Sequence, residues 1–435
     1  MRGAEVPVRG DVPRTHRGDG PPDAPVGQRG PAQAEVAAAL VATVVFLTAI
    51  APLATDTYVP AFPAVADDLA AAATQVQLTL TTFFVGMALG QLIGGPVSDQ
   101  RGRKRPLIAA VVVMTLASVA CALAPGIAVM MVARAVQGFA GGWAMVIGRA
   151  VIVDLASGAQ LVRVLNVIAA VGGIAPVAGP LLGAVILHLS GWRASFWALA
   201  VLGVAMTVAV LLVVPETLPP AARHGGGLRA VVTSGRQVLR NRRYVGYVLV
   251  AGSSMGAIFA YVSTSAFVLQ SVNGLSPIVY SLDFAANAVG MTIAALVAAR
   301  LAGRVPTRRI IVFGQVPALA AGIAMLIGAL WFQTPLLLVI VVFFVLMTTA
   351  GLIGPNGGAL ASAEVPEHPG TGSAVLGFVQ WSFAGLTAPL AGLGGERSAV
   401  PMAVLVIACT TLSVVGLAVA RPRRTTGPAP GPPEN

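Results

Sequence analysis

Charged side chains are rare inside the apolar runs of this sequence, and three of them have the chemistry to move protons or bind ions. Asp56, Arg134 and Asp283 each lie within a long apolar stretch. A charge at the centre of a bilayer costs about 2.5–3.5 kcal/mol on insertion scales, so such residues usually face the interior of a helix bundle. Asp56 lies seven residues before Pro63, Arg134 seven after Ile127 and Asp283 seven after Ser276. These reference positions are near the predicted outer ends of the helices, so each side chain lies at a depth of about 10 Å at about 1.5 Å per residue. We therefore expect the three side chains to meet in one cavity that leans toward the outer surface.

A proton-exchange mechanism follows from this set as a hypothesis. Asp56 would hold a proton while it is shielded from water, and an approach of Arg134 would favour proton release. A membrane potential contributes about 2.3 kcal/mol per charge per 100 mV to such a cycle. Asp56 could instead cap a helix end at the outer interface. Asp283 is equally consistent with a contact to a cationic substrate, a second proton site or a water-exposed position at the outer mouth.

Aromatic and amide side chains in the same apolar runs are candidates for substrate contacts. Ligand cavities combine apolar walls with a few polar groups. The candidates are Tyr58, Trp143, Tyr261, Asn287, Asn356, Gln380 and Trp381. Tyr and Trp are also common anchors at membrane interfaces, so each has a structural alternative.

The elements that position these residues are membrane helices. Of the 435 residues, 56% are hydrophobic and 10% are charged, whereas soluble domains carry roughly 25% charged residues. A helix needs about 20 apolar residues to cross the hydrocarbon core. Twelve such spans are predicted, near residues 38–60, 76–97, 106–124, 127–150, 165–187, 194–214, 245–269, 277–300, 309–330, 335–359, 372–393 and 399–420.

The order of the spans predicts an all-α membrane protein of two pseudo-symmetric six-helix bundles, with a substrate site between them. The predicted organisation is a disordered cytoplasmic tail over 1–34, bundles over 35–217 and 244–420, a cytoplasmic linker over 218–243 and a cytoplasmic tail over 421–435. The linker is consistent with either an amphipathic helix on the anionic inner leaflet or a plain solvated segment.

The net charge of +11 comes from cations in alternate loops. Basic clusters fall in the N-terminal tail and near 101–105, 223–243, 300–309 and 421–424. This alternation predicts that both termini and the linker face the cytoplasm of a bacterial inner membrane. A nucleic-acid partner would need the basic residues gathered on one folded face, and we exclude it.

The sequence lacks the residues that several other classes of function require. Cys121 and Cys409 lie inside apolar runs, and the four histidines fall in tails or loops, so neither a metal site nor another cofactor is expected. Lys104, the single lysine, is followed by Arg105, which excludes a phosphate-binding P-loop. No catalytic Ser/His constellation appears inside a span, and we expect no enzyme activity.

The most specific motif is GGPVSDQRGRKRP, from Gly94 to Pro106. It resembles the cytoplasmic loop motif of the major facilitator superfamily, and the resemblance implies a gating role for Gly95, Asp99, Gly102, Arg103 and Lys104. We expect Gly95 to let two helices approach and Asp99 to pair with an arginine or cap a neighbouring helix. A loop that only fixes topology is the alternative.

Further matches to this superfamily follow in order along the chain. RAVQG at 134–138 resembles its fourth-helix motif, in which an intramembrane arginine is linked to proton coupling. GPLLGA at 179–184 is similar to the fifth-helix motif of its antiporters and supplies Gly179, Pro180 and Gly183, although Ala184 replaces the final glycine. Arg149 and Asp154 are expected to form a pair at the inner end of the fourth span.

ATDTYVPAFP at 54–63 resembles the first-helix motif of the Bcr/CflA group of multidrug exporters. The resemblance covers roughly residues 38–420 and implies a monomeric drug:proton antiporter that exports small, moderately lipophilic compounds. Asp283 departs from that group, where the corresponding residue is usually apolar. Uptake or uniport of an endogenous metabolite by the same fold remains the alternative, because a fold does not fix a function.

Overall fold

The computed structural model describes residues 31–156, 158–223, 227–367, 369–395 and 398–421. The predicted tails therefore lie almost wholly outside the described residues. Eleven helices in the described part are long and apolar enough to cross a membrane, and α6 adds a shorter apolar segment over Ala175–Ser190. The prediction of an all-α membrane protein with two six-helix bundles is confirmed.

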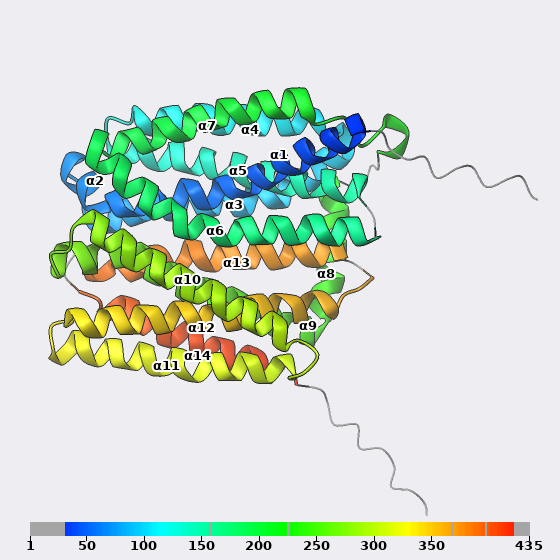
Figure 1. Cartoon of the computed structure of the whole chain (residues 1–435). Helices are drawn as coiled ribbons and strands as arrows, with labels where there is room; N and C mark the ends of the chain where they lie inside the picture. Colours follow the sequence, from blue (N-terminus) through cyan, green and yellow to red (C-terminus); the bar gives the residue numbers. More distant parts are fainter. Residues whose placement is uncertain (1–30, 157, 224–226, 368, 396–397, 422–435) are drawn as a thin grey trace, which may run out of the picture.

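The helices of the first half are α1 (Pro31–Asp56), η1 (Val59–Ala61), α2 (Phe62–Asp68), α3 (Ala73–Arg101), α4 (Lys104–Ala122), α5 (Ile127–Leu155), α6 (Gly158–Ser190) and α7 (Trp192–Val213). Those that follow are η2 (Pro220–Ala222), α8 (Gly227–Arg240), α9 (Arg242–Ala266), η3 (Phe267–Val272), α10 (Pro277–Leu301), α11 (Thr307–Trp331), α12 (Leu336–Ala363), α13 (Pro369–Ala391), η4 (Gly392–Gly394) and α14 (Val400–Val419). Figure 1 shows α1 and α3–α7 in one half and α9–α14 in the other.

The first predicted span is broken near its outer end. Helix α1 ends at Asp56, and a short 3₁₀ turn at Val59–Ala61 leads into α2. Pro60 and Pro63 stand in this segment, and proline has no backbone N–H to continue the helical hydrogen bonds. Asp56 is therefore the last residue of a membrane helix, buried between the two halves.

The central linker contains a helix. Helix α8 crosses one end of the bundle (Figure 1) and contacts α3 of the first half and α9 and α13 of the second. Val238 of α8 is buried and packs in a cluster with Tyr244 and Val365. Of the two alternatives for this segment, the helix is the one that forms.

Glycines bring α3 and α5 into backbone contact. A Cβ atom added to Gly90 would lie 2.0 Å from the carbonyl oxygen of Phe139, and one added to Gly138 would lie 1.9 Å from that of Phe83. Gly86 and Gly142 are as tightly packed. Small residues four apart are the usual means of close helix approach in membranes.

A substitution in this contact has a clear expected result. Gly138→Ala must push the backbones of α3 and α5 apart, because the obstructing atom is a main-chain oxygen. Overpacking of this kind costs about 1–3 kcal/mol, so thermal unfolding in detergent should occur at a lower temperature. Gly141→Ala is the control, since its added Cβ would lie 3.7 Å from the Met114 sulfur. Equal unfolding temperatures for the two variants would contradict this packing.

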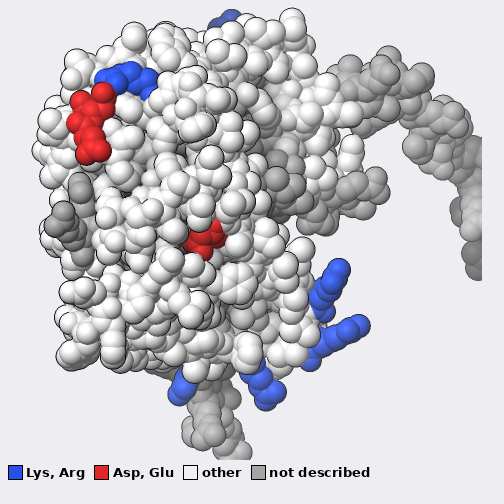
Figure 2. Space-filling model, turned by 60° about the vertical axis from the view of Figure 1, so that its left-hand side comes forward, with Lys and Arg blue, Asp and Glu red and all other residues white. Residues whose placement is uncertain are grey.

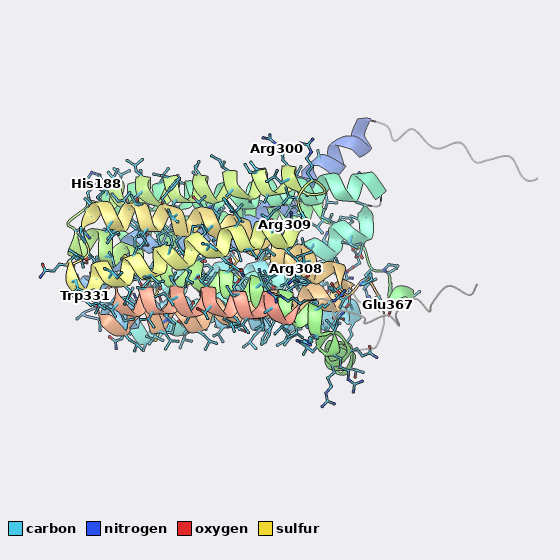
Figure 3. All side chains as sticks on the ribbon, turned by 90° about the horizontal axis from the view of Figure 1, so that it is seen from below. His188, Arg300, Arg308, Arg309, Trp331 and Glu367 are labelled. Carbon is cyan, nitrogen blue, oxygen red and sulfur yellow. The ribbon has the colours of Figure 1, made fainter. Side chains whose placement is uncertain are left out.

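The two ends of the bundle differ in charge. Arg300, Arg308, Arg309 and Glu367 lie at one end, which we name the basic end, while His188 and Trp331 lie at the opposite end (Figure 3). Figure 2 shows one cluster of acidic and basic side chains and one separate acidic side chain on the face turned to the viewer, with further basic side chains along the lower edge.

The halves are joined most firmly at the opposite end. Between described residues, two hydrogen bonds cross from one half to the other: Gln77 Nε2 donates to the Ser263 carbonyl at 2.9 Å, and Gln270 Nε2 donates to the Pro60 carbonyl at 3.1 Å. The rings of Phe62 and Phe267 also meet here, with centroids 5.9 Å apart. The two halves are therefore in direct contact at the opposite end. The predicted cavity that leans toward the outer surface stays a prediction.

Candidate functional site

Asp56 lies at the junction of the two halves without a polar partner. Its side chain is 6% exposed, and no described residue forms a hydrogen bond or an ion pair with it. A buried ionised carboxylate without a partner is strongly disfavoured. The site therefore suits a carboxyl group that holds a proton in this conformation.

Helix α6 fits against Asp56 through the glycines of the GPLLGA motif. A Cβ added to Gly179 would lie 2.7 Å from the Asp56 Cβ, and one added to Gly183 would lie 2.2 Å from the Thr57 carbonyl oxygen. These two glycines allow α6 to lie directly on the turn of α1 that carries the carboxyl. This contact could not be predicted from the sequence, because the two motifs are more than a hundred residues apart.

Arg134 is fully buried and surrounded by aromatic rings. Its Nη1 donates to the Ala54 carbonyl at 3.1 Å and to Gln137 Oε1 at 2.6 Å. Its guanidinium carbon lies 4.2 Å from the centre of the Phe83 ring and 5.1 Å from that of Tyr58. Cation–π contacts of this kind are worth about 2 kcal/mol or more when desolvated. Nε and Nη2 have no hydrogen-bond partner within the described part of the chain.

Asp56 and Arg134 do not meet in this conformation. Arg134 contacts α1 at Ala54, two residues before Asp56. The guanidinium donates to the backbone there, and no hydrogen bond or ion pair joins it to the Asp56 carboxyl among the described residues.

Asp283 faces the junction from the second half. Asn287 Nδ2 donates to Asp283 Oδ2 at 2.9 Å and to the Tyr261 hydroxyl at 3.0 Å. The hydroxyl of Tyr280 lies 3.0 Å from Ser265 Oγ. Both Asp56 and Asp283 lie close enough to the hydroxyls of Tyr261 and Tyr280 for an electrostatic interaction. Two carboxyl groups from different halves thus lie within electrostatic range of the same two tyrosines.

The aromatic and amide candidates separate into three situations. Tyr58, Tyr261 and Asn287 are buried and hydrogen bonded, Tyr58 to Thr79 Oγ1 at 3.1 Å. Trp381 is partly exposed and stacks on Phe84 of the other half, with ring centroids 5.4 Å apart.

Of the other three candidates, Trp143 and Asn356 lie nearer the basic end of their helices, and Gln380 lies at the middle of α13. Trp143 packs against Phe139, with ring centroids 5.3 Å apart, and Asn356 donates to the Leu352 carbonyl of its own helix at 2.8 Å. Gln380 is partly exposed. The candidates with surface left for a substrate are therefore Trp143, Asn356, Gln380 and Trp381, and their role stays a prediction.

The loop motif at the basic end builds a polar cluster within the first half. Arg103 binds Asp99 and Asp154, with its Nε 3.0 Å from Asp154 Oδ2. Burial alone would lower the pKa of Arg103, but hydrogen bonds to Asp154 and Asp99 outweigh it and raise the pKa above its ordinary value. Arg103 is therefore a permanent cation that ties α3 to α5.

Glu216, which the sequence analysis did not single out, caps helix α4. Its carboxylate accepts from the backbone N–H of Arg103 at 2.7 Å and of Lys104 at 3.3 Å. Gly102 adopts φ +90°, and a Cβ there would lie 2.5 Å from Glu216 Oε2. The PET sequence at 215–217 was the available signal for this capping contact. Its Thr217 also belongs to the polar cluster, since the hydroxyl donates to Asp154 at 2.7 Å.

We expect Glu216→Gln to weaken this end of the bundle. A charged acceptor is stronger than a neutral one at a helix start, and loss of a cap costs about 0.5–2 kcal/mol. The variant should unfold at a lower temperature in detergent, whereas Glu367→Gln, which removes an exposed carboxylate, should not change it. An unchanged unfolding temperature for Glu216→Gln would refute the capping role.

Two sequence interpretations in this region are wrong. A Cβ added to Gly95 would have nothing within 4 Å, whereas one added to Gly94 would lie 2.9 Å from the Trp143 ring. Gly94, and not Gly95, lets the helices approach. Asp154 pairs with Arg103, and no ion pair joins it to Arg149 among the described residues. Arg149 is exposed instead.

The comparisons with known proteins agree with this architecture. The family model for the Major Facilitator Superfamily matches residues 44–389. An uncharacterized MFS-type transporter, YdgK of Bacillus subtilis, is 33% identical over 82% of this chain and 89% of its own length. A bicyclomycin resistance protein homologue of Haemophilus influenzae is 28% identical over 86% of this chain and 94% of its own. The multidrug resistance protein MdtL of Escherichia coli K12 is also 28% identical, over 87% of this chain and 94% of its own.

Solved structures show the same fold at low identity. A bacterial homologue of the human lysosomal transporter Spinster, in an inward-facing and occupied conformation, superposes with a TM-score of 0.68 at 15% identity, over 90% of this chain and 97% of that one. The human organic anion transporter MFSD10 gives 0.60 at 16% identity, over 90% and 100%. The resemblance to Bcr/CflA-like transporters is confirmed by the named relatives, and the chain belongs to the Major Facilitator Superfamily.

Proposed function

We propose that this protein is a proton-coupled secondary transporter that exports small, moderately lipophilic drugs or natural products by alternating access. The observation that carries the proposal is Asp56, a buried carboxyl without a polar partner in the described structure, placed where the two halves meet. The similarity to a bicyclomycin resistance homologue and to MdtL supports drug export as its purpose.

The basic end is proposed to face the cytoplasm of a bacterial inner membrane, as the arginine-rich loops favour. With the opposite end closed by Gln77, Gln270 and the Phe62–Phe267 contact, the conformation would then be inward-facing. A substrate would enter from the cytoplasm, and we take the working unit to be a monomer.

In this scheme the protonated Asp56 belongs to the inward-facing state. Asp56 would take up its proton from the outer side while the opposite end is open, and would release it to the cytoplasm when a substrate binds in the inward-facing state. Arg134 contacts the same helix at the Ala54 carbonyl, two residues before Asp56, and a movement of the end of α1 that brings it toward the carboxylate would favour this release. Asp283 is proposed as a second acidic group that faces the same tyrosines from the second half.

Transport by inverted vesicles or proteoliposomes tests this function. With an imposed pH gradient that is acidic inside inverted vesicles, we expect accumulation of a phenicol, a bicyclomycin-like compound or a lipophilic cation, and loss of accumulation when an ionophore collapses the gradient. Transport that equilibrates a compound without regard to the gradient would show a uniporter. Accumulation that follows the opposite gradient would show uptake by symport.

A further inference from the structure

An apolar groove lies on the exposed side of the second half, between helices α10, α11 and α12. Its volume is about 570 Å³, and α10, α11 and α12 form its walls. This volume falls within the range of about 300–1,000 Å³ that is usual for ligand sites. Ile293, Val297 and Phe313 line it, and each leaves between 45% and 73% of its surface exposed. In a membrane these side chains would contact lipid.

One end of the groove is cationic. Arg309 lines it, and Arg300 and Arg304 stand at the same end of α10 and in the turn that follows. Figure 3 shows Arg300 and Arg309 at the basic end. None of these three arginines has an ion pair with a described residue.

Arg308, the residue before Arg309, has a structural role. Arg308 donates to the Tyr247 hydroxyl at 3.0 Å and to the carbonyl oxygens of Ala420 at 2.9 Å and Leu417 at 2.7 Å. Its guanidinium thereby ties α11 to α9 and α14. No described residue accepts a hydrogen bond from the Arg309 side chain, which lies beside an apolar groove instead.

The length of the groove matches one leaflet. On α10 it runs from Gly290 to Leu301, a difference of eleven residues and about 16 Å at about 1.5 Å per residue. Half of a hydrocarbon core about 30 Å thick is about 15 Å. An acyl chain that lies in the groove would therefore bring its headgroup to the level of Arg309.

We propose that this groove binds one anionic phospholipid, with its phosphate on Arg309, Arg304 and Arg300 and one acyl chain between α10, α11 and α12. With the basic end at the cytoplasmic side, as proposed above, charge complementarity selects this occupant, because the inner leaflet is anionic and a zwitterionic lipid offers the same chains without the net charge. The site belongs to the second half alone and does not depend on the exported compound.

Binding of phosphatidylglycerol and phosphatidylcholine to the delipidated full-length protein, followed by native mass spectrometry, tests the site. We expect the parent to bind the first phosphatidylglycerol more tightly than phosphatidylcholine. Arg304→Gln with Arg309→Gln should weaken that binding about 25-fold, at about fivefold for each arginine near the membrane surface, and should leave phosphatidylcholine unchanged. The control of equal charge is Arg101→Gln with Arg105→Gln, two exposed arginines of the first half.

The apolar part of the site needs its own test. A phosphatidylglycerol with a photoactivatable acyl chain should crosslink within 290–301, 310–313 or 344–352, and Val297→Trp, which fills the groove, should remove that crosslink while the arginines remain. Equal binding of the two lipids by the parent would overturn the proposal. So would equal losses in the two arginine pairs, or a crosslink that persists at these residues in Val297→Trp.

Discussion

Asp56→Asn is expected to abolish proton-driven accumulation of substrate while leaving substrate exchange intact. The amide has nearly the shape of the carboxyl and fits against Gly179, but it cannot take up or release a proton. Loss of a proton-transfer group typically costs at least about 100-fold in rate. Accumulation against a gradient should fall by that factor, measured as uptake of labelled compound into inverted vesicles that are acidic inside.

The exchange reaction separates coupling from folding. In counterflow, where labelled and unlabelled substrate trade places without net proton movement, Asp56→Asn should retain transport within about threefold of the parent, a difference that amounts to less than about 0.7 kcal/mol. Asp283→Asn is the comparison, because its amide can still bond with Asn287. If Asp283→Asn loses accumulation and Asp56→Asn keeps it, the proton site lies in the second half.

Gly183→Ala should inactivate both accumulation and exchange. The Cβ atom of the new alanine would lie 2.2 Å from the Thr57 carbonyl oxygen. This main-chain oxygen cannot move away by a change of rotamer, as a side chain can. Helix α6 must then move away from the end of α1, at a cost of about 1–3 kcal/mol, and the turn after Asp56 loses its support. We expect less than about a tenth of parental transport, which is a loss of about 1.4 kcal/mol or more in the rate-limiting step.

Gly148→Ala provides the matched control for Gly183→Ala. Gly148 is also buried within a membrane helix, but an added Cβ there would meet side chains of Val44 and Leu47 at ordinary distances of 3.5 Å and more. This variant should transport like the parent. Full activity of Gly183→Ala would show that the contact between α6 and the end of α1 is not needed for transport.

The membrane spans were predictable from the sequence because the lipid bilayer requires a long apolar segment for each crossing. A helix must be apolar over about 20 residues to cross, so the span order, the break at the central linker and the basic loops followed from hydropathy and charge. The family resemblance followed from the loop motif at Gly94–Pro106 and is confirmed by the family model.

Side-chain partners were harder to predict, since they depend on which way a helix faces. Asp56 and Arg134 were expected to approach each other, yet Arg134 donates to the Ala54 carbonyl and no ion pair joins it to Asp56 among the described residues. The choice between Gly94 and Gly95 depended on the rotation of the helix about its axis, as one residue turns the position by about 100°. Such a rotation is not encoded in hydropathy when the whole helix is apolar.

Contacts between distant segments were invisible for another reason. Glu216 caps α4 from 113 residues beyond Arg103. Gly179 contacts Asp56 although the membrane helices α3, α4 and α5 lie between them in the chain. Each motif was recognised alone, but a single sequence does not pair them. The helical state of α8 stayed open because a basic, amphipathic segment is stable as a helix only where a surface covers its apolar side.

The central claim is that substrate binding displaces a proton from Asp56. Its most direct test is the pH change on addition of an identified substrate to the purified protein in weakly buffered detergent solution, which requires no gradient and no net transport. We predict proton release from the parent and from Asp283→Asn, and none from Asp56→Asn at substrate concentrations that saturate binding. Release of the same amount from Asp56→Asn, or binding by the parent without any release, would contradict the account.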